Sequence, residues 1–251
     1  MNPRRLRLAF GIFGSLLMCA CASAPGRPQP GDVPPIPSEV SDFSVLYGQN
    51  CAGCHGVEGK GGAALALGDP VYLAIADDSV IRNAATNGIA GTSMPAFAQS
   101  AGGMLTQKQI DAIVSGMRTK WAKPDILRGV NPPAYAAPLS AAPAMAGDAA
   151  RGAQVYERFC SSCHGAGGRG GAKASSIVDS SFLALLTDQE LRTLVIVGRP
   201  ELGAPDWRND VPGQPMTSPE ISDVVAWLAA QRAKFPGQPF PNPTNATGEI
   251  R

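Results

Sequence analysis

Histidine is the residue that this 251-residue sequence has least of, with only two. Aromatic residues are 6%, which is low for a large all-β domain. Basic and acidic residues nearly balance, 21 against 20, which argues against the strongly basic face of a nucleic-acid-binding protein. Charged residues reach 16% and hydrophobic ones 44%, which excludes a disordered chain and allows packed cores. By its length, the chain should form one or two domains.

Long uncharged apolar runs are also missing, apart from a short one near the N-terminus. There, three arginines precede the run Leu8–Met18, which is too short to span a bilayer of about 30 Å. Residues 1–21 are therefore predicted to be a signal peptide of the lipoprotein type, with Cys21 as the lipidated residue. Residues 22–37 are rich in proline and predict an extended tether. The alternatives are a retained anchor helix and ordinary secretion with a disordered leader.

The remainder of the chain is a tandem duplication around a five-residue motif. The sequence Cys51-Ala52-Gly53-Cys54-His55 recurs as Cys160-Ser161-Ser162-Cys163-His164, an offset of 109 positions (160 − 51). Related residues recur outside the motif at offsets of 109 to 111, among them the pairs Tyr47 and Tyr156, Asp69 and Asp179, Gly88 and Gly198, and Thr106 and Thr217. We therefore divide the chain into a first copy, 38–130, an Ala- and Pro-rich linker, 131–147, a second copy, 148–236, and a Pro-rich C-terminal tail, 237–251.

Helical signals agree between the copies and predict an all-α fold class. Apolar residues recur at helical spacing near the end of each copy, and no segment alternates with period two for long. The first helix of each copy is expected to begin at an N-cap, Ser41 or Asp148, and the middle helix to end at a left-handed cap, Gly88 or Gly198. The predicted helices cover 41–50, 78–87 and 106–121 in the first copy and 148–159, 188–197 and 218–235 in the second.

A Cys-x-x-Cys-His motif places two thiols one helical turn apart, followed by an imidazole. The thiols can form thioethers with the two vinyl groups of haem, and the imidazole then faces the iron. A zinc site would require the two cysteine pairs to come together, although each has its own glycine-rich loop and helices. A disulfide within one turn would close no long loop. The motifs predict thioethers at Cys51, Cys54, Cys160 and Cys163, with His55 and His164 as iron ligands.

On these motifs, both copies resemble class I cytochrome c domains, and their arrangement resembles di-haem bacterial cytochromes of the cytochrome c4 type. The resemblance implies a small helical fold around each of two covalently bound haems c, with a distal methionine from a loop before the last helix. In the first copy, Met94-Pro95 matches that loop, so Met94 is expected to be the second ligand of the first iron. Met104 is a competing sulfur, but it almost reaches the predicted helix start and is expected to pack.

The second copy departs from this pattern at the distal ligand. Ala204 occupies the register of Met94, and alanine cannot bind iron. The nearest sulfur is Met216, which follows its histidine by 52 residues (216 − 164) and aligns with the apolar Leu105. Two interpretations remain open. Either a rearranged loop brings Met216 to the second iron, which is the reading we favour from sequence, or Met216 packs and that iron has a weak or vacant sixth position.

The duplication also predicts how the first and last helices cross. The second copy has Gly152 on its first helix and Trp227 on its last, whereas the first copy has Phe43 and Gly116 at the corresponding positions. A close crossing needs a small residue that faces a large one, so the two copies are expected to use the same space with the large residue on opposite helices.

The resemblance implies an electron-transfer protein rather than an enzyme, located in the periplasm or on the periplasmic face of a bacterial membrane. A quinol-oxidising complex or a dehydrogenase would donate electrons, and an oxidase or another cytochrome would accept them. No nucleic-acid partner is expected, and the lipid on Cys21 would supply a membrane contact. The alternatives use an open second haem, as a peroxidase, a small-oxyanion dehydrogenase or a gas-binding protein. Asp206 and Arg208 lie near Ala204 in sequence, but they read as loop surface.

Overall fold

A computed structural model of the chain describes residues 26, 34–136 and 147–233. They fall into two compact units, Met1–Val40 and Ser41–Arg251. The described residues are helical and contain no strand, only two isolated β-bridges. The all-α prediction is therefore confirmed. Within the described ranges, no helix combines the length and apolar character that a membrane crossing needs. The predicted signal peptide, Cys21 and the C-terminal tail lie outside the described residues.

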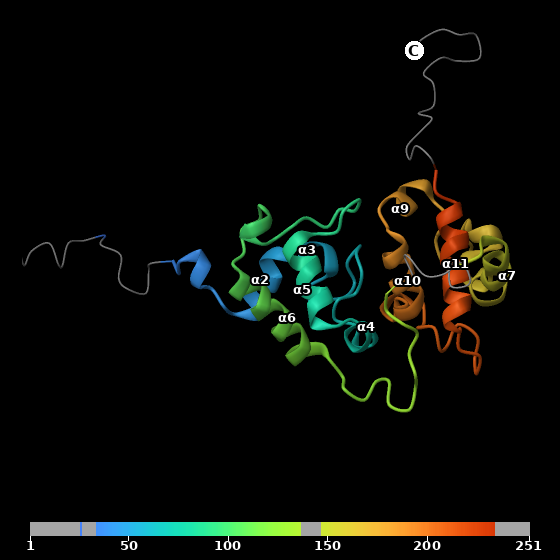
Figure 1. The fold of residues 1–251 in the computed structure, drawn as a ribbon, viewed down its shortest axis with the longest axis horizontal. Helices are drawn as coiled ribbons and strands as arrows, with labels where there is room; N and C mark the ends of the chain where they lie inside the picture. The colour runs from blue at the N-terminus through green and yellow to red at the C-terminus, as the bar shows by residue number, and fades with distance from the viewer. Residues whose placement is uncertain (1–25, 27–33, 137–146, 234–251) are drawn as a thin grey trace, which may run out of the picture. The chain divides into compact units, whose positions relative to one another are not determined.

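The first copy consists of five α-helices joined by long loops (Figure 1). A one-turn 3-10 helix, η2 (Pro37–Glu39), belongs to the N-terminal unit. The longest helix, α6, contacts α2, α4 and α5. The elements of the copy are α2 (Phe43–Asn50), α3 (Ala52–His55), α4 (Pro70–Ile75), α5 (Asp78–Asn87), η3 (Gln99–Ala101) and α6 (Gln107–Trp121).

The second copy repeats this order of helices (Figure 1). Its last helix, α11, contacts both α7 and α10, as α6 contacts α2 and α5 in the first copy. Two tandem helical copies of one fold are therefore present, as the duplication predicts. The elements are α7 (Ala149–Phe159), α8 (Ser161–His164), η4 (Ala166–Gly168), α9 (Ser180–Ala184), α10 (Asp188–Val197), η5 (Pro200–Leu202) and α11 (Ser218–Ala230).

The helix bounds agree with the predictions for α5 and α10 and differ elsewhere. The predicted N-cap Ser41 is wrong, because Asp42 caps α2 and its Oδ1 accepts a hydrogen bond from the Val45 N–H at 2.9 Å. An N-cap side chain reaches the second or third amide after it, and Ser41 lies four residues before Val45. Helix α11 ends at Ala230 instead of extending to residue 235. The glycines after α5 and α10 have positive φ but extended ψ, so neither forms a left-handed cap: Gly88 has φ 69° and ψ −171°.

Several pairs that recur between the copies are helix caps. Asp69 and Asp179 cap α4 and α9, two short helices that the sequence analysis did not predict. Thr106 and Thr217 begin α6 and α11 with complete capping boxes, because each hydroxyl accepts from the third amide of the helix and the side chain there returns a bond. The repeated polar residues therefore fix where the helices start.

The exchange of large and small residues at the helix crossing is confirmed. A Cβ atom on Gly116 of α6 would lie 2.7 Å from the Cβ of Phe43 on α2. A Cβ atom on Gly152 of α7 would lie 2.7 Å from the Cβ of Trp227 on α11, and inside the contact distance of the Asp223 carbonyl oxygen. Each copy thus brings its first and last helices together over one glycine, which belongs to opposite helices in the two copies.

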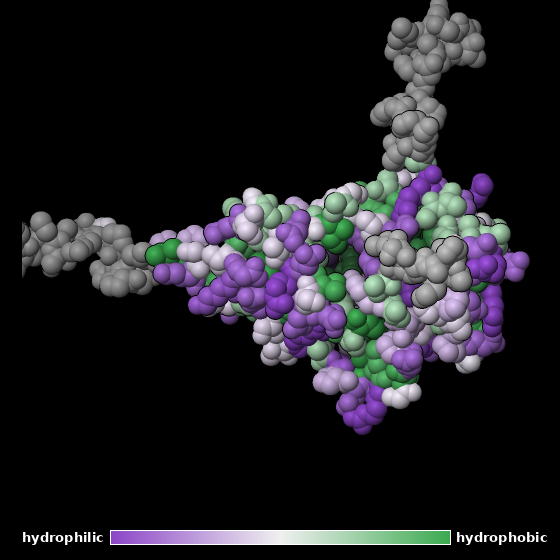
Figure 2. Space-filling model, in the orientation of Figure 1, coloured by the Kyte–Doolittle hydropathy of each residue, from purple (hydrophilic) through white to green (hydrophobic). Residues whose placement is uncertain are grey.

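Apolar side chains that reach the surface do so in several places among polar ones, on the face drawn in Figure 2. Among the residues that the structure describes, the most exposed large ones are Met104 (82%) and Val57 (76%), both in the first copy. Met104 was expected to pack at the start of α6, and this expectation is wrong. Leu105, the next residue, is the buried one (6% exposed), so it takes the packing position before the N-cap.

Candidate haem sites

The two Cys-x-x-Cys-His motifs have the same backbone geometry. In each, the first cysteine ends one helix and begins a one-turn helix that holds the second cysteine and the histidine. The backbone angles of Cys51 are φ −117° and ψ −36°, and those of Cys160 are φ −118° and ψ −31°. The spacing thus places both thiols and the imidazole of each motif on a single turn.

The imidazole of each motif is oriented by a carbonyl oxygen of the glycine-rich loop that follows. The Nδ1 atom of His55 lies 2.7 Å from Leu65 O, and that of His164 lies 2.9 Å from Ser175 O. A carbonyl oxygen only accepts, so Nδ1 carries the proton and donates it. The Nε2 lone pair of each ring is then available for a metal, which is the arrangement that metal-ligating histidines use.

Burial keeps the first imidazole neutral. His55 is 8% exposed, and this desolvation lowers its pKa. The bond to Leu65 O acts in the opposite direction, and the positive charge of Arg199 lowers the pKa further. A neutral imidazole is the form that binds iron, so the surroundings of His55 favour the ligating state before any metal is bound.

A buried tyrosine ties the first helix of each copy to the end of its motif. The Tyr47 hydroxyl donates to Gly56 O at 3.0 Å, and the Tyr156 hydroxyl donates to Gly165 O. Both rings are almost completely buried. The sequence alone shows that this pair of tyrosines recurs but does not indicate its role. Its role is to hold the glycine that follows the histidine, and so to fix the turn that carries the imidazole.

The loop that carries Met94 folds back onto the end of α5. The Ile89 N–H donates to Met94 O at 3.1 Å, and the Met94 N–H donates to the Thr92 hydroxyl at 3.1 Å. A Cβ on Gly88 would lie 2.6 Å from Met94 O, so only glycine allows this approach. The Met94 side chain is half-buried. The loop is therefore held by its backbone, and its one sulfur is not locked into the core.

The corresponding loop of the second copy follows the same path with Ala204 in place of methionine. A Cβ on Gly198 would lie 2.7 Å from Ala204 O and would also strike Pro205 O. The Trp207 N–H donates to Ile196 O, in the last turn of α10, at 3.1 Å. In the first copy the Phe97 N–H makes the same kind of bond to α5. The register that the sequence predicts for Ala204 is thus also its place in the fold.

Met216 occupies the position of Leu105. The Met216 N–H donates to Trp207 O at 2.9 Å, and the Leu105 N–H donates to Phe97 O at 2.8 Å. Both residues directly precede the threonine that caps the last helix. Met216 is 2% exposed, so its side chain is enclosed by protein atoms as that of Leu105 is.

Four charged residues of the second loop form ion pairs and do not lie free at the surface. Arg199 and Glu201 pair at 2.6 Å with both side chains 16% exposed, and a second nitrogen of Arg199 donates to Gly62 O at 2.8 Å. Asp206 and Arg208 also pair at 2.6 Å, and the Asp206 side chain is only 12% exposed. Their interpretation as loop surface is therefore wrong, because the loop folds these side chains against the protein.

Buried titratable groups surround the second motif. Burial raises the pKa of the Cys160 thiol to about 12, and the charge of Asp210 adds to this rise. Burial, together with the charge of Asp206, raises the pKa of Asp210 itself to about 7. In the first motif, burial likewise raises the pKa of Cys51 to about 12. Asp210 is therefore an acid close to the second motif, and Ser100 stands at the corresponding position of the first copy.

A zinc site is not supported by the side chains that the structure describes. Among them, no group of three or more histidine, cysteine, aspartate or glutamate residues is arranged so that it could hold a metal ion, whereas structural zinc needs four ligands. Each cysteine pair remains with its own histidine. Two thiols on one turn and an imidazole with a free Nε2 instead fit one covalently bound haem in each copy.

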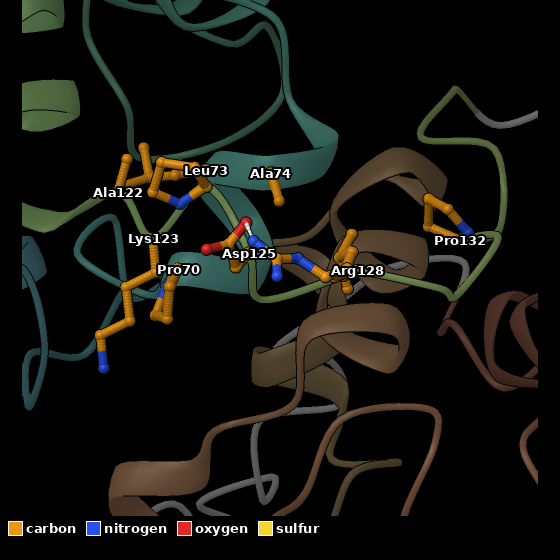
Figure 3. Close-up of a pocket in the computed structure, with 10 residues that line it drawn as sticks. Pro70, Leu73, Ala74, Ala122, Lys123, Asp125, Arg128 and Pro132 are labelled. Carbon is orange, nitrogen blue, oxygen red and sulfur yellow. Dashed lines mark ion pairs between the residues drawn. The ribbon is translucent and has the colours of Figure 1, made fainter.

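A surface pocket of the first copy involves none of these residues (Figure 3). It lies where α4 faces the segment after α6, and Asp125 and Arg128 form an ion pair at its rim. No cysteine, histidine or methionine lines it, so it offers no ligand for iron. Its lining consists of Pro70, Leu73, Ala74, Ala122, Lys123, Pro124, Asp125, Leu127, Arg128 and Pro132.

Both copies match the model of a known protein family. The model described as cytochrome c oxidase, cbb3-type, subunit III matches residues 38–115 and 147–228, one match in each copy. The chain belongs to this family. It is therefore a c-type cytochrome with covalently bound haem c and a role in electron transfer.

One curated relative is similar to about half of the chain. The chain is 30% identical over 130 residues to the cbb3-type cytochrome c oxidase subunit CcoP of Azospirillum sp. (strain B510). The alignment covers 47% of the chain and 37% of the relative, so the chain matches little more than a third of that protein.

Two solved structures show weaker likeness. A Kuenenia stuttgartiensis reducing HAO-like protein complex (Kustc0457/Kustc0458) has 18% identity and a TM-score of 0.43, over 79% of this chain and 99% of that one. Thiosulfate dehydrogenase (TsdBA) from Marichromatium purpuratum has 20% identity and a TM-score of 0.30, over 87% and 52%. At these TM-scores the likeness carries no functional argument.

Proposed function

We propose that the protein carries electrons one at a time through two covalently bound haems c, on the periplasmic side of a bacterial membrane. The observation that carries this proposal is the equivalence of the two motifs, in backbone angles and in the carbonyl that orients each imidazole. The first haem would be held by Cys51, Cys54 and His55, and the second by Cys160, Cys163 and His164. Haem iron so held supplies one-electron exchange between its ferric and ferrous states.

Met94 is proposed as the second ligand of the first iron. Its loop is fixed by backbone bonds to the end of α5, and its sulfur lies on a half-buried side chain. Histidine and methionine together raise the reduction potential and close the iron to other ligands. The protein buries His55, holds its Nδ1–H in a hydrogen bond to Leu65 O and fixes the distal loop. Little therefore has to move when the iron changes charge.

The proposed partners are membrane respiratory complexes. A quinol-oxidising complex or a dehydrogenase would donate electrons, and an oxidase or another cytochrome would accept them, in keeping with the oxidase subunit CcoP to which the chain is similar. Each copy has a formal charge of −1, from seven basic and eight acidic residues in 38–130 and nine and ten in 148–236. Docking is therefore proposed to use apolar groups such as Val57 with a mixed rim, and a lipid on Cys21 would raise the local concentration of partners.

Haem quantitation of variants tests the proposal. The protein is produced with a haem-attachment system, and covalent haem per chain is measured for wild type, for Cys51→Ala with Cys54→Ala, and for Cys160→Ala with Cys163→Ala. We expect two haems in wild type and one in each double variant. Redox titration should then show two one-electron steps in wild type. Bound zinc in place of haem, or one haem in wild type, would contradict the proposal.

A further inference from the structure

The two copies agree around the histidine and differ on the opposite, distal side of the proposed haem. Met94 and Ala204 hold the same place, because each has its carbonyl oxygen against the glycine that ends the preceding helix, Gly88 or Gly198. The residue after each glycine donates its N–H to the same carbonyl, Ile89 to Met94 O at 3.1 Å and Arg199 to Ala204 O at 2.9 Å. The loop of the second copy is therefore not shifted along the chain, and what it presents is a methyl group.

Met216 is not in a place to replace the missing sulfur. Its backbone bond to Trp207 O reproduces the bond of Leu105 to Phe97 O, and its side chain is buried as that of Leu105 is. Leucine and methionine have similar volumes and exchange readily in cores. The segment Arg208–Pro215 is one residue longer than its counterpart in the first copy, Ala98–Met104, and this residue is accommodated before Met216 without moving it from the packing position.

Other protein donors for the sixth position are few. The chain has two histidines, and each belongs to a motif. Met216 is the only methionine of the second copy within the described range 147–233, and Met145 lies outside the described residues. The nearby charges of Arg199, Glu201, Asp206 and Arg208 are held in ion pairs. The remaining carboxyl of the loop is that of Asp210, and carboxylate oxygens suit hard cations, whereas iron is better served by imidazole.

We propose that the iron of the second haem binds an exogenous uncharged diatomic molecule, of the class of carbon monoxide, at the position opposite His164. The proposal rests on the proposed function for the presence of that haem. Replacing methionine by Ala204 removes the Cγ, Sδ and Cε atoms of the ligand, which leaves room for two atoms. The arginines of this loop, Arg199 and Arg208, are paired with Glu201 and Asp206, so neither positive charge is left to attract an anion. On this proposal, the iron of the first copy is closed to added ligands and the iron of the second copy is open to them.

Carbon monoxide binding by the intact di-haem protein tests this inference. The protein is reduced with dithionite and titrated with carbon monoxide while its haem absorption is recorded. We expect wild type to bind one carbon monoxide per two haems. Ala204→Met should reduce that binding at least tenfold, because it restores the sulfur of the first copy. Met216→Leu, the matched control, should bind as wild type does and keep its spectrum, because leucine already occupies this position in the first copy.

Each outcome decides the matter. Two haems per chain without carbon monoxide binding would overturn the inference and leave the proposed function intact, whereas fewer than two haems would overturn the proposed function. A change in the low-spin spectrum of Met216→Leu would identify Met216 as a ligand and also overturn the inference. If Ala204→Met does not fold, wild type and Met216→Leu still give the answer.

Discussion

The glycine at each helix crossing should be far less tolerant of a methyl group than a glycine elsewhere on the same helices. Gly48, on the exposed side of α2, has nothing within 4 Å of an added Cβ, so Gly48→Ala should gain about 0.5–1 kcal/mol from the reduced freedom of the unfolded chain. Gly116→Ala should gain the same stability from the unfolded chain, but its Cβ would lie 2.7 Å from the Cβ of Phe43 and closer still to the Phe43 ring. Overpacking of this kind costs about 1–3 kcal/mol.

The net changes follow from these magnitudes. Gly116→Ala should lose up to about 2 kcal/mol, since the overpacking cost exceeds the helical gain. Gly152→Ala should lose more, because the added methyl meets the carbonyl oxygen of Asp223, which can move only with the whole of α11. Truncating Phe43 removes the group that the new methyl of Gly116→Ala would strike, but nothing that opposes Gly152→Ala. The double variant Phe43→Ala with Gly116→Ala should therefore be more stable than the sum of the two single changes in unfolding free energy, by about 0.5–3 kcal/mol.

The assay is urea denaturation of the protein with haem attached, followed by circular dichroism. The free energies of unfolding are compared for Gly48→Ala, Gly116→Ala, Gly152→Ala and the double variant with Phe43→Ala. Gly116→Ala as stable as Gly48→Ala would refute the reasoning, since the crossing would then not be tight. Equal losses at Gly116 and Gly152 would show that contact with a side chain and contact with the backbone are equivalent here.

Three further predictions concern single groups. Thr217→Ala should cost about 1 kcal/mol, because it removes the cap of α11 and its exchange of bonds with Glu220, and the melting temperature should fall accordingly. Asp210→Asn should raise the melting temperature at pH 8 and leave it unchanged at pH 4: with a native pKa of about 7, Asp210 binds a proton that the unfolded chain releases, so its contribution to stability falls as pH rises from about 4 to 7. Arg199→Gln should lower the reduction potential of the first haem in a redox titration, because a positive charge near His55 is lost and Glu201 is left unpaired. Arg199→Lys keeps the positive charge and should keep most of the wild-type potential.

The duplication explains why so much of this fold could be predicted from one sequence. A residue that recurs at a constant offset has been placed twice by the same local geometry, and Thr106 with Thr217 proves to be a pair of helix caps. The exchange of large and small residues at the helix crossing could be predicted for the same reason, because the chain contains two copies of the crossing to compare. The helices α4 and α9 were missed because six and five residues are too few to show a helical period.

The parts of the site that could not be predicted are made by the backbone. The carbonyl oxygens of Leu65 and Ser175 orient the imidazoles, and any residue type could supply them. The side chains give no signal for such a contact, so only the path of the loop reveals it. The pairing of Asp206 with Arg208 was misjudged for a related reason, because two charges two positions apart look like surface until the loop closes around them.

Comparison of the copies separates what each half of a haem site requires. Everything that holds the proximal histidine is repeated: the one-turn helix, the carbonyl acceptor and the tyrosine behind it. On the distal side, the second copy keeps the backbone path but not the methionine, and places two ion pairs along the loop. Because the path is kept, the loop is still needed as structure. The loss of the sulfur therefore changes the chemistry at one position and leaves the fold that surrounds it unchanged.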